Sequence, residues 1–230
     1  MPNADEDHIR GVGILVNKNI GGALLEWIPI SERIITARIQ TKLRNMSIVQ
    51  CYAPTENAEL DEKEAFYSLL DKTLVGIKRS GINVMMGDFN VKVGNNNQDI
   101  KHIMSRHGMP CDKENEKGQL LIELCGKHGL VIGGTVFPQK EGHKVTWIPP
   151  DKDKQGRNQT DHICISRNWR KSLLDVRNKR GADIGSDHHM IMGILRIKTK
   201  KVIRNATNRR RYNLKRLEDI KSQRTFKTKL

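Results

Sequence analysis

The chain has 230 residues, of which 37% are hydrophobic and 29% charged, and it carries a formal net charge of +15. This composition excludes a disordered chain and is sufficient for one hydrophobic core. No run approaches the roughly 18–20 apolar residues that span a bilayer, and the start MPNADEDHIR is too acidic for a signal peptide. An intracellular protein without a membrane partner is expected.

Most of the excess charge lies at the C-terminal end. Residues 198–230 contain thirteen Lys and Arg against Glu218 and Asp219, a net of +11 out of +15. We therefore expect a domain over 1–197 and a basic connector tail over 198–230. Such a tail favours a nucleic-acid partner through counterion release, although a solvated extension without a partner is the alternative. Its KTKK and RRR runs favour the nucleus over the cytoplasm, and no stable protein partner is expected.

The first half of the chain shows short β-branched or alternating runs, followed by a helical pattern. The runs at 11–17, 33–40 and 46–52 are separated by turn residues and predict an antiparallel meander. Apolar residues at helical spacing predict a helix over 59–79, which ends before Ser80-Gly81. The apolar run 82–87 predicts a central strand.

The second half alternates between the same two patterns. A polar loop from Val91 to Glu116 precedes a predicted helix at 117–128 and a strand at 130–133. Further strands are predicted at Thr146-Trp147, 161–166 and 188–197. Because short turns join many neighbouring strands, we expect an α/β (α+β) fold with two stacked mixed β-sheets flanked by helices, in a four-layer sandwich.

The sharpest motif is Gly87-Asp88-Phe89-Asn90, at the end of the predicted central strand. Side chains two residues apart in a strand point the same way, so Asp88 and Asn90 could reach one ligand. The carboxylate can transfer a proton and the carboxamide can orient water or a phosphate oxygen. Taken alone, an Asp-x-Asn sequence after a strand is more often a turn motif.

Two Asp-His motifs adjoin other predicted strands, Thr160-Asp161-His162 and Ser186-Asp187-His188-His189. An imidazole paired with a carboxylate keeps a defined tautomer and holds its proton beside an anion, which suits a phosphodiester. Each pair alone is more often a capping or surface feature. If the strands are regular, His162 and His189 face away from the other candidates and are not expected to act.

In this order and spacing, the motifs resemble the endonuclease/exonuclease/phosphatase superfamily, whose fold is DNase-I-like. Within this superfamily, the sequence resembles the endonuclease domains of non-LTR retrotransposons in particular. This resemblance covers the stretch from Gly11 to Ile197, including TENAELDEKEAFYSLL and GHKVTWIPPD. It is carried by Tyr52-Ala53-Pro54-Thr55, Gly87-Asp88-Phe89-Asn90, Thr146-Trp147, Thr160-Asp161-His162-Ile163 and Gly185-Ser186-Asp187-His188.

The resemblance implies an endonuclease that nicks DNA and leaves a 3′-hydroxyl. Asp88 would activate the attacking water or serve the leaving oxygen, and Asn90 would position the water or the scissile phosphate. His188, oriented by Asp161, would contact the phosphate. The implied cofactor is Mg²⁺, with Mn²⁺ as the alternative.

Three further roles follow from the same resemblance. Tyr52 would donate a hydrogen bond to a phosphate oxygen, Thr55 would contact the substrate where some relatives use Asn, and Asp187 would assist metal binding. From the residues alone, Tyr52 is equally well a core aromatic, and Trp147 is better explained as one.

The resemblance also has gaps. Family domains place an Asn-bearing strand, and then a strand followed by a metal-binding Glu, before the equivalent of Gly11-Val12-Gly13-Ile14. We therefore expect an N-terminally truncated domain with weak or absent activity. The alternative function is a catalytically silent nucleic-acid-binding protein that uses the basic tail. A small phosphate ester is a less favoured substrate.

Overall fold

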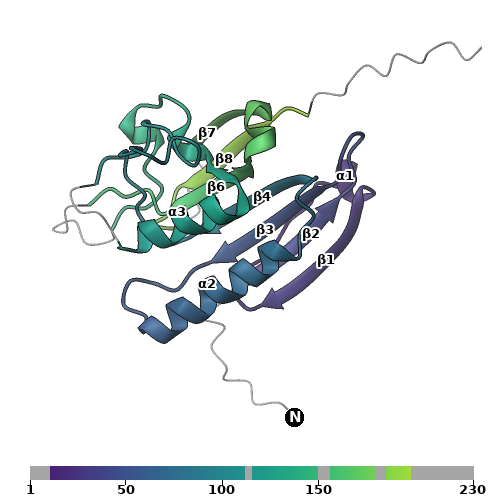
Figure 1. The fold of residues 1–230 in the computed structure, drawn as a ribbon, viewed down its shortest axis with the longest axis horizontal. Helices are drawn as coiled ribbons and strands as arrows, with labels where there is room; N and C mark the ends of the chain where they lie inside the picture. Colours follow the sequence, from purple (N-terminus) through teal and green to yellow (C-terminus); the bar gives the residue numbers. More distant parts are fainter. Residues whose placement is uncertain (1–10, 112–115, 150–155, 180–184, 198–230) are drawn as a thin grey trace, which may run out of the picture. The chain divides into compact units, whose positions relative to one another are not determined.

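The computed structural model describes residues 11–111, 116–149, 156–179 and 185–197 (Figure 1). The basic connector expected at 198–230 lies outside these residues and stays a prediction. Within the described part of the chain, no helix is both long and apolar enough to cross a membrane.

The fold is built on a six-stranded mixed sheet with the strand order β1-β2-β3-β4-β6-β5. The first three strands form an antiparallel meander, whereas β3 and β4 run parallel because a helix connects them. Both β4 and β5 pair antiparallel with β6. The strand bounds are β1 (Leu24–Ser31), β2 (Ile34–Ile39), β3 (Met46–Tyr52), β4 (Ile82–Asp88), β5 (Leu130–Ile132) and β6 (Asp161–Ser166).

Two helices, α2 (Leu60–Val75) and α3 (Glu116–His128), cover one face of this sheet, as Figure 1 shows. Buried residues of α2 such as Phe66 and Leu70 pack with the sheet residues Val49 and Met85 in the main hydrophobic core. The two helices are joined at Asp71 of α2, whose carboxylate oxygens lie 2.8 Å from the side-chain nitrogens of Lys127 and His128.

A second, smaller sheet packs on the opposite face of the main sheet. Its strands β7 (Leu173–Lys179) and β8 (Met190–Leu195) are antiparallel. Leu173 and Val176 of β7 form a second apolar cluster with Ile82, Ile163 and Ile165 of the main sheet. The predicted mixed α/β architecture is therefore confirmed for the main sheet. The second sheet was expected to be mixed, but it has only two strands, which are antiparallel. The described residues form three layers, whereas four were predicted.

Several strand predictions need correction. Residues 11–17 form no strand in the structure, and the first strand is β1, which follows the short helix α1 (Lys18–Gly21). Val12, Ile14 and Val16 are partly buried while Leu15 is fully exposed, so the run alternates as predicted. Alternation alone does not make a strand, because a strand also needs a hydrogen-bonded neighbour. Neither β1 nor β7 was predicted, and the strand expected at 188–197 is the shorter β8. The strand expected at Thr146-Trp147 is reduced to isolated bridges from Trp147 to Asn158 and His188.

Candidate active site

The candidate site begins where β4 and β6 lie side by side. Asp88 ends β4, Asp161 begins β6, and the two residues are direct partners in the antiparallel register. Both side chains project towards the second sheet, where they line one cleft with Met86 and Ile163. Adjacent strands thus bring together two carboxylates that are 73 positions apart in the chain.

Gly87 allows this arrangement because it brings β4 close to β3. Its φ is +144°, a conformation that side chains disfavour, and a Cβ atom built there would lie 1.8 Å from the carbonyl oxygen of Cys51. The glycine of the Gly87-Asp88-Phe89-Asn90 motif is therefore required by the backbone, independently of any chemistry.

Asn90 does not continue the strand, as the period-two argument assumed. Its φ is +52°, and its backbone N–H donates to Oδ1 of Asp88 over 2.9 Å. Its side-chain Nδ2 donates to the carbonyl oxygen of Ala53, also over 2.9 Å. The turn interpretation is therefore correct, and the turn itself holds Asp88 and Asn90 beside each other.

His188 completes a group of three side chains. Its Nδ1 lies 3.0 Å from Oδ2 of Asp161, and its Nε2 lies 3.9 Å from Oδ2 of Asp88. These distances bring together three of the predicted site residues, which come from β4, β6 and the turn before β8.

The pKa values of Asp88 and His188 are both raised above their ordinary values. Burial, followed by the negative charge of Asp161, raises the pKa of Asp88 to about 6, while the Asn90 N–H opposes the rise. The hydrogen bond that the His188 ring donates to the Asp161 carboxylate raises the pKa of His188 above its ordinary value, against the effect of burial. Near neutral pH the site therefore holds an ionised Asp88 beside an imidazole that retains its proton more strongly than usual.

Thr146 and Trp147 hold the segments that carry these residues. The buried Thr146 hydroxyl accepts hydrogen bonds from the backbone N–H groups of Thr160 (3.0 Å) and Asp161 (3.1 Å). The backbone of Trp147 bridges to His188, and the N–H of His189 donates to the Thr146 carbonyl. This positioning function of Thr146 was missed in the sequence, where its place next to an aromatic residue gives only a weak signal.

The Trp147 side chain also differs from the expected core aromatic. Its indole Nε1–H donates to Oδ2 of Asp187 over 2.8 Å. Asp187 is exposed, and it lies one residue before His188. One oxygen of the carboxylate that was predicted to assist metal binding is therefore engaged by the indole.

Tyr52 and Thr55 lie on the β3 side of the site. Tyr52 is the parallel partner of Asp88 in the sheet, and with Asp88 and Asp161 it lines a cleft of about 440 Å³. The guanidinium carbon of Arg33 lies 5.3 Å from the centre of the Tyr52 ring. Thr55 is exposed in the turn that follows β3, so the structure brings Tyr52, but not Thr55, into the cleft lining.

A divalent cation fits the donor set of the site. One ligand atom from each of Asp88, Asp161 and His188 can be chosen so that all three lie within 4.8 Å of one another. Carboxylate oxygens are the donors that Mg²⁺ prefers, and an imidazole nitrogen also suits Mn²⁺.

His162 is separate from this group although it follows Asp161. It is completely buried, and its Nε2 lies 3.0 Å from the carbonyl oxygen of Val91. Burial lowers its pKa, so the ring stays neutral. Its role in the structure is to hold the loop that leaves Asn90.

No family model matches the chain. Its structure does resemble solved nucleases. The endonuclease domain of TRAS1, a telomere-specific non-LTR retrotransposon, matches 76% of this chain and 70% of that domain, with a TM-score of 0.55 and 15% identity. The NExo 3′ phosphatase from Neisseria, solved with a product DNA hairpin, matches 76% of this chain and 72% of that chain, with a TM-score of 0.56 and 18% identity.

The chain has the endonuclease/exonuclease/phosphatase fold, also called DNase-I-like. Within this DNase-I-like domain, Asp88, Asp161 and His188 meet at one end of the main sheet. Its sequence is also 36% identical over 191 residues to craniofacial development protein 2 of Bos taurus. That match covers 83% of this chain and 31% of the relative, so the DNase-I-like chain spans about a third of the relative's length.

Proposed function

We propose that the chain is a metal-dependent nuclease domain of retrotransposon origin that nicks DNA and leaves a 3′-hydroxyl. The observation that carries the proposal is the convergence of Asp88, Asp161 and His188 at one edge of the sheet. The fold supports it, since matching structures include a retrotransposon endonuclease and an AP endonuclease from Archaeoglobus fulgidus.

Asp88 and His188 would carry the central steps. With its pKa at about 6, Asp88 is mostly ionised at neutral pH and can take a proton from the attacking water or serve the leaving oxygen. His188 keeps its proton because Asp161 accepts at Nδ1, so Nε2 can donate to the negative phosphate. Water adds to phosphorus as Asp88 takes its proton, and the bond from phosphorus to the 3′ oxygen breaks. The 3′ oxygen takes up a proton from solvent and leaves as a hydroxyl, the phosphate stays on the 5′ side, and Asp88 returns its proton to solvent.

The remaining candidates would position the substrate. Asn90, with one Nδ2–H fixed on the Ala53 carbonyl, presents its Oδ1 as an acceptor to the water and its second Nδ2–H as a donor to the scissile phosphate. The Tyr52 hydroxyl would donate to a phosphate oxygen, and Thr55 would contact the strand beyond it. Bound Mg²⁺ or Mn²⁺ would polarise the phosphate and stabilise the charge on the leaving oxygen.

Asp88 and Asp161 would hold the metal, and Asp187 would assist through the oxygen that Trp147 does not engage. Among the described residues, the group able to bind a cation contains no Glu. We therefore propose a weaker metal site, and a lower rate, than in a site that has an additional carboxylate ligand. The basic tail would strengthen DNA binding, and its Lys and Arg runs support nuclear residence.

The test is a supercoiled-plasmid nicking assay with the full chain, in Mg²⁺ and in EDTA. The variants Asp88→Asn and His188→Gln should each lower the Mg²⁺-dependent rate by about 10²-fold or more. Asp61→Asn and His102→Gln make the same changes at exposed positions and should nick at the wild-type rate. Equal nicking by all five proteins would show that the activity arises elsewhere, for example from a contaminant.

The second candidate function is DNA binding without cleavage. It is favoured by one observation, the net charge of +11 over residues 198–230. It predicts tight, salt-sensitive DNA binding that Asp88→Asn leaves unchanged. A chain ending at Ile197 should bind DNA much more weakly, and its affinity should depend less steeply on salt. Undiminished binding by the shortened chain would exclude the tail as the binding element.

A further inference from the structure

Arg33 lies next to the candidate site, and the proposed reaction does not use it. It directly precedes β2, and its carbonyl oxygen accepts a hydrogen bond from the backbone N–H of Tyr52 over 2.9 Å. Only 12% of the Arg33 side chain is exposed. A guanidinium that is largely buried needs partners for its N–H groups, so its contacts show what it does in the structure.

The guanidinium donates two hydrogen bonds. Its Nη1 donates to the carbonyl oxygen of Tyr52 over 3.3 Å, and its Nη2 donates to Oε1 of Glu62 over 2.8 Å. Glu62 belongs to the first turn of α2, and 33% of its side chain is exposed. The ion pair therefore links the end of β3 to the start of α2, and it fixes the direction of the Arg33 side chain.

The same guanidinium also contacts the ring of Tyr52. Its central carbon lies 5.3 Å from the ring centre, within the limit of about 6 Å for a cation–π contact. Arg33 thus holds Tyr52 by a hydrogen bond in each direction and by the ring contact. None of these three contacts uses the phenolic hydroxyl, which stays available to a ligand.

Tyr52 connects Arg33 to the candidate site. It is the direct partner of Asp88 in the parallel register of β3 and β4, and it lines the same cleft as Asp88 and Asp161. Arg33 is not among the described residues that line this cleft. Because the ring turns about the bonds that join it to the backbone, a group that holds the ring also sets the direction of the hydroxyl.

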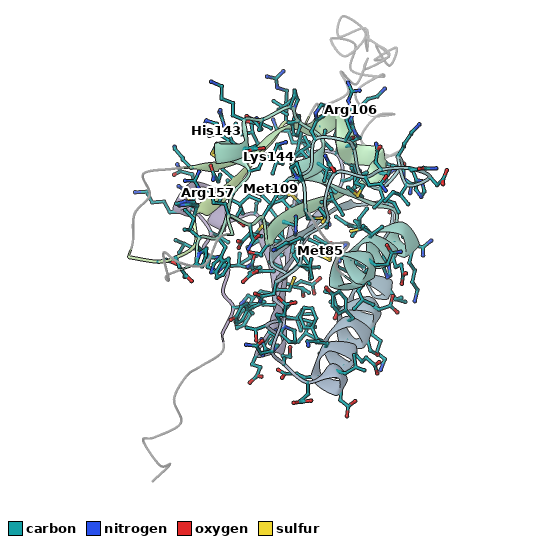
Figure 2. All side chains as sticks on the ribbon, turned by 90° about the vertical axis from the view of Figure 1, so that its left-hand side faces the viewer. Met85, Arg106, Met109, His143, Lys144 and Arg157 are labelled. Carbon is teal, nitrogen blue, oxygen red and sulfur yellow. The ribbon has the colours of Figure 1, made fainter. Side chains whose placement is uncertain are left out.

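Other cations of the domain have different surroundings. Figure 2 shows Lys144 and Arg157 at the loop end of the domain. The Lys144 ammonium donates to the carbonyl oxygen of Gly108 over 3.3 Å, and Arg157 lines a narrow hollow of about 10 Å³. In the described part of the chain, Arg33 is the cation that lies over an aromatic ring of the candidate site.

We propose that Arg33 is a positioning residue of the candidate site, which holds the Tyr52 ring so that its hydroxyl can donate to a phosphate oxygen in the cleft. Glu62 assists by holding the guanidinium. The inference rests on the proposed function, because it assumes that a DNA phosphate lies at the β4–β6 edge. A Lys at this position would keep the charge, but it lacks the planar fork that reaches a carboxylate, a carbonyl and a ring together.

The first test follows the Tyr52 ring in the full chain without DNA. The chain has three tyrosines, so fluorine NMR of the protein labelled with fluorotyrosine should show three signals, and the one lost in Tyr52→Phe belongs to Tyr52. Arg33→Lys should shift this signal. Arg38→Lys makes the same change on β2, where the side chain pairs with Glu26, and should leave the signal in place. An unchanged Tyr52 signal in Arg33→Lys would overturn the proposal, whether or not the protein cuts DNA.

The second test measures DNA affinity in a double-mutant cycle. Fluorescence anisotropy with a labelled duplex in EDTA, at one salt concentration, reports binding without cleavage. Tyr52→Phe and Arg33→Lys should each weaken binding about fivefold, the effect of about one hydrogen bond. The double variant should lose no more than either single variant, because both changes remove the same contact. Tyr67→Phe, on α2, is the control for the loss of a hydroxyl and should bind like the wild type.

Each outcome separates a positioning role from a direct one. Losses that add in the double variant would overturn the proposal, because Arg33 would then contact DNA independently of Tyr52. Wild-type affinity in Arg33→Lys would also overturn it, since the positive charge alone would then explain the residue. If the plasmid is not nicked but the cycle shows full coupling, the proposed reaction fails and the role of Arg33 stands. Normal nicking with additive losses would have the opposite meaning.

Discussion

The imidazole Nδ1 of His188 lies 3.0 Å from Oδ2 of Asp161, and this contact fixes the turn before β8 to the first residue of β6. Because the same imidazole reaches within 3.9 Å of Asp88 through Nε2, it lies between two carboxylates. The charge state of His188 is therefore coupled to a carboxylate on β4 and to a carboxylate on β6.

Replacement of Asp161 by Asn should lower the pKa of His188 towards its ordinary value, since Asp161 is the main cause of the rise. A raised imidazole pKa contributes stability that is fully present below the unfolded value of about 6.5 and is lost as pH rises through the folded value. NMR titration of His188 measures the shift directly. Urea unfolding between pH 6 and 8 should show a flatter pH dependence in the variant, and an unchanged His188 titration would contradict the assignment.

Replacement of Asp88 by Asn should stabilise the fold while it removes activity. The folded pKa of about 6 exceeds the unfolded value near 4, so ionisation costs stability as pH rises between these values. The variant avoids this cost, and its Oδ1 can still accept the Asn90 N–H. We expect a gain of about 1–3 kcal/mol in the free energy of unfolding at pH 7.5, and little gain at pH 4. Asp61→Asn is the control and should show no such dependence on pH.

Replacement of Thr146 by Val should lower the free energy of unfolding, because the hydroxyl that supports the backbone next to Asp161 is lost. The methyl group keeps the volume of the hydroxyl, but the N–H groups of Thr160 and Asp161 lose their acceptor. We expect a loss of about 1–3 kcal/mol in unfolding experiments, whereas Thr146→Ser, which keeps the hydroxyl, should lose less. Equal stability of the Val and Ser variants would show that another group accepts these hydrogen bonds.

Replacement of Gly87 by Ala should prevent normal pairing of β3 and β4. The new methyl group would overlap the Cys51 carbonyl, and the φ of +144° is unfavourable for any side chain. A large fall in melting temperature, or failure to fold, is expected by circular dichroism. Gly22→Ala, at a position with open space around it and a helical φ of −66°, should melt like the wild type.

The elements with strong local signals could be predicted from the sequence. The helices α2 and α3 and the strands β4 and β6 were predicted to within a few residues, because the helices have apolar residues at helical spacing and the strands are short apolar runs. The grouping of Asp88, Asp161 and His188 was also predicted, by the family resemblance that their motifs carry. The roles of these residues in a reaction stay predictions.

The features that depend on distant partners could not be predicted. β7 has an irregular pattern, in which Leu173, Val176 and Asn178 are buried, and its pairing with β8 is not visible locally. Residues 11–17 have the pattern of a strand, yet pattern alone supplies no hydrogen-bonded neighbour. The hydrogen bond between Trp147 and Asp187 joins positions 40 apart, so a core role was the natural interpretation of the aromatic.

The direct pairing of Asp88 with Asp161 also bears on which changes in the sequence the site tolerates. Side chains alternate along a strand, so a shift of one residue in β6 would turn Asp161 towards the helices. The neutral His162 would then take the place of Asp161 beside Asp88. Single substitutions elsewhere would erode the site gradually, whereas the insertion or deletion of one codon within β4 or β6 would abolish it in one step. The arrangement of the site therefore depends more on the register of these two strands than on the number of substitutions elsewhere in the domain.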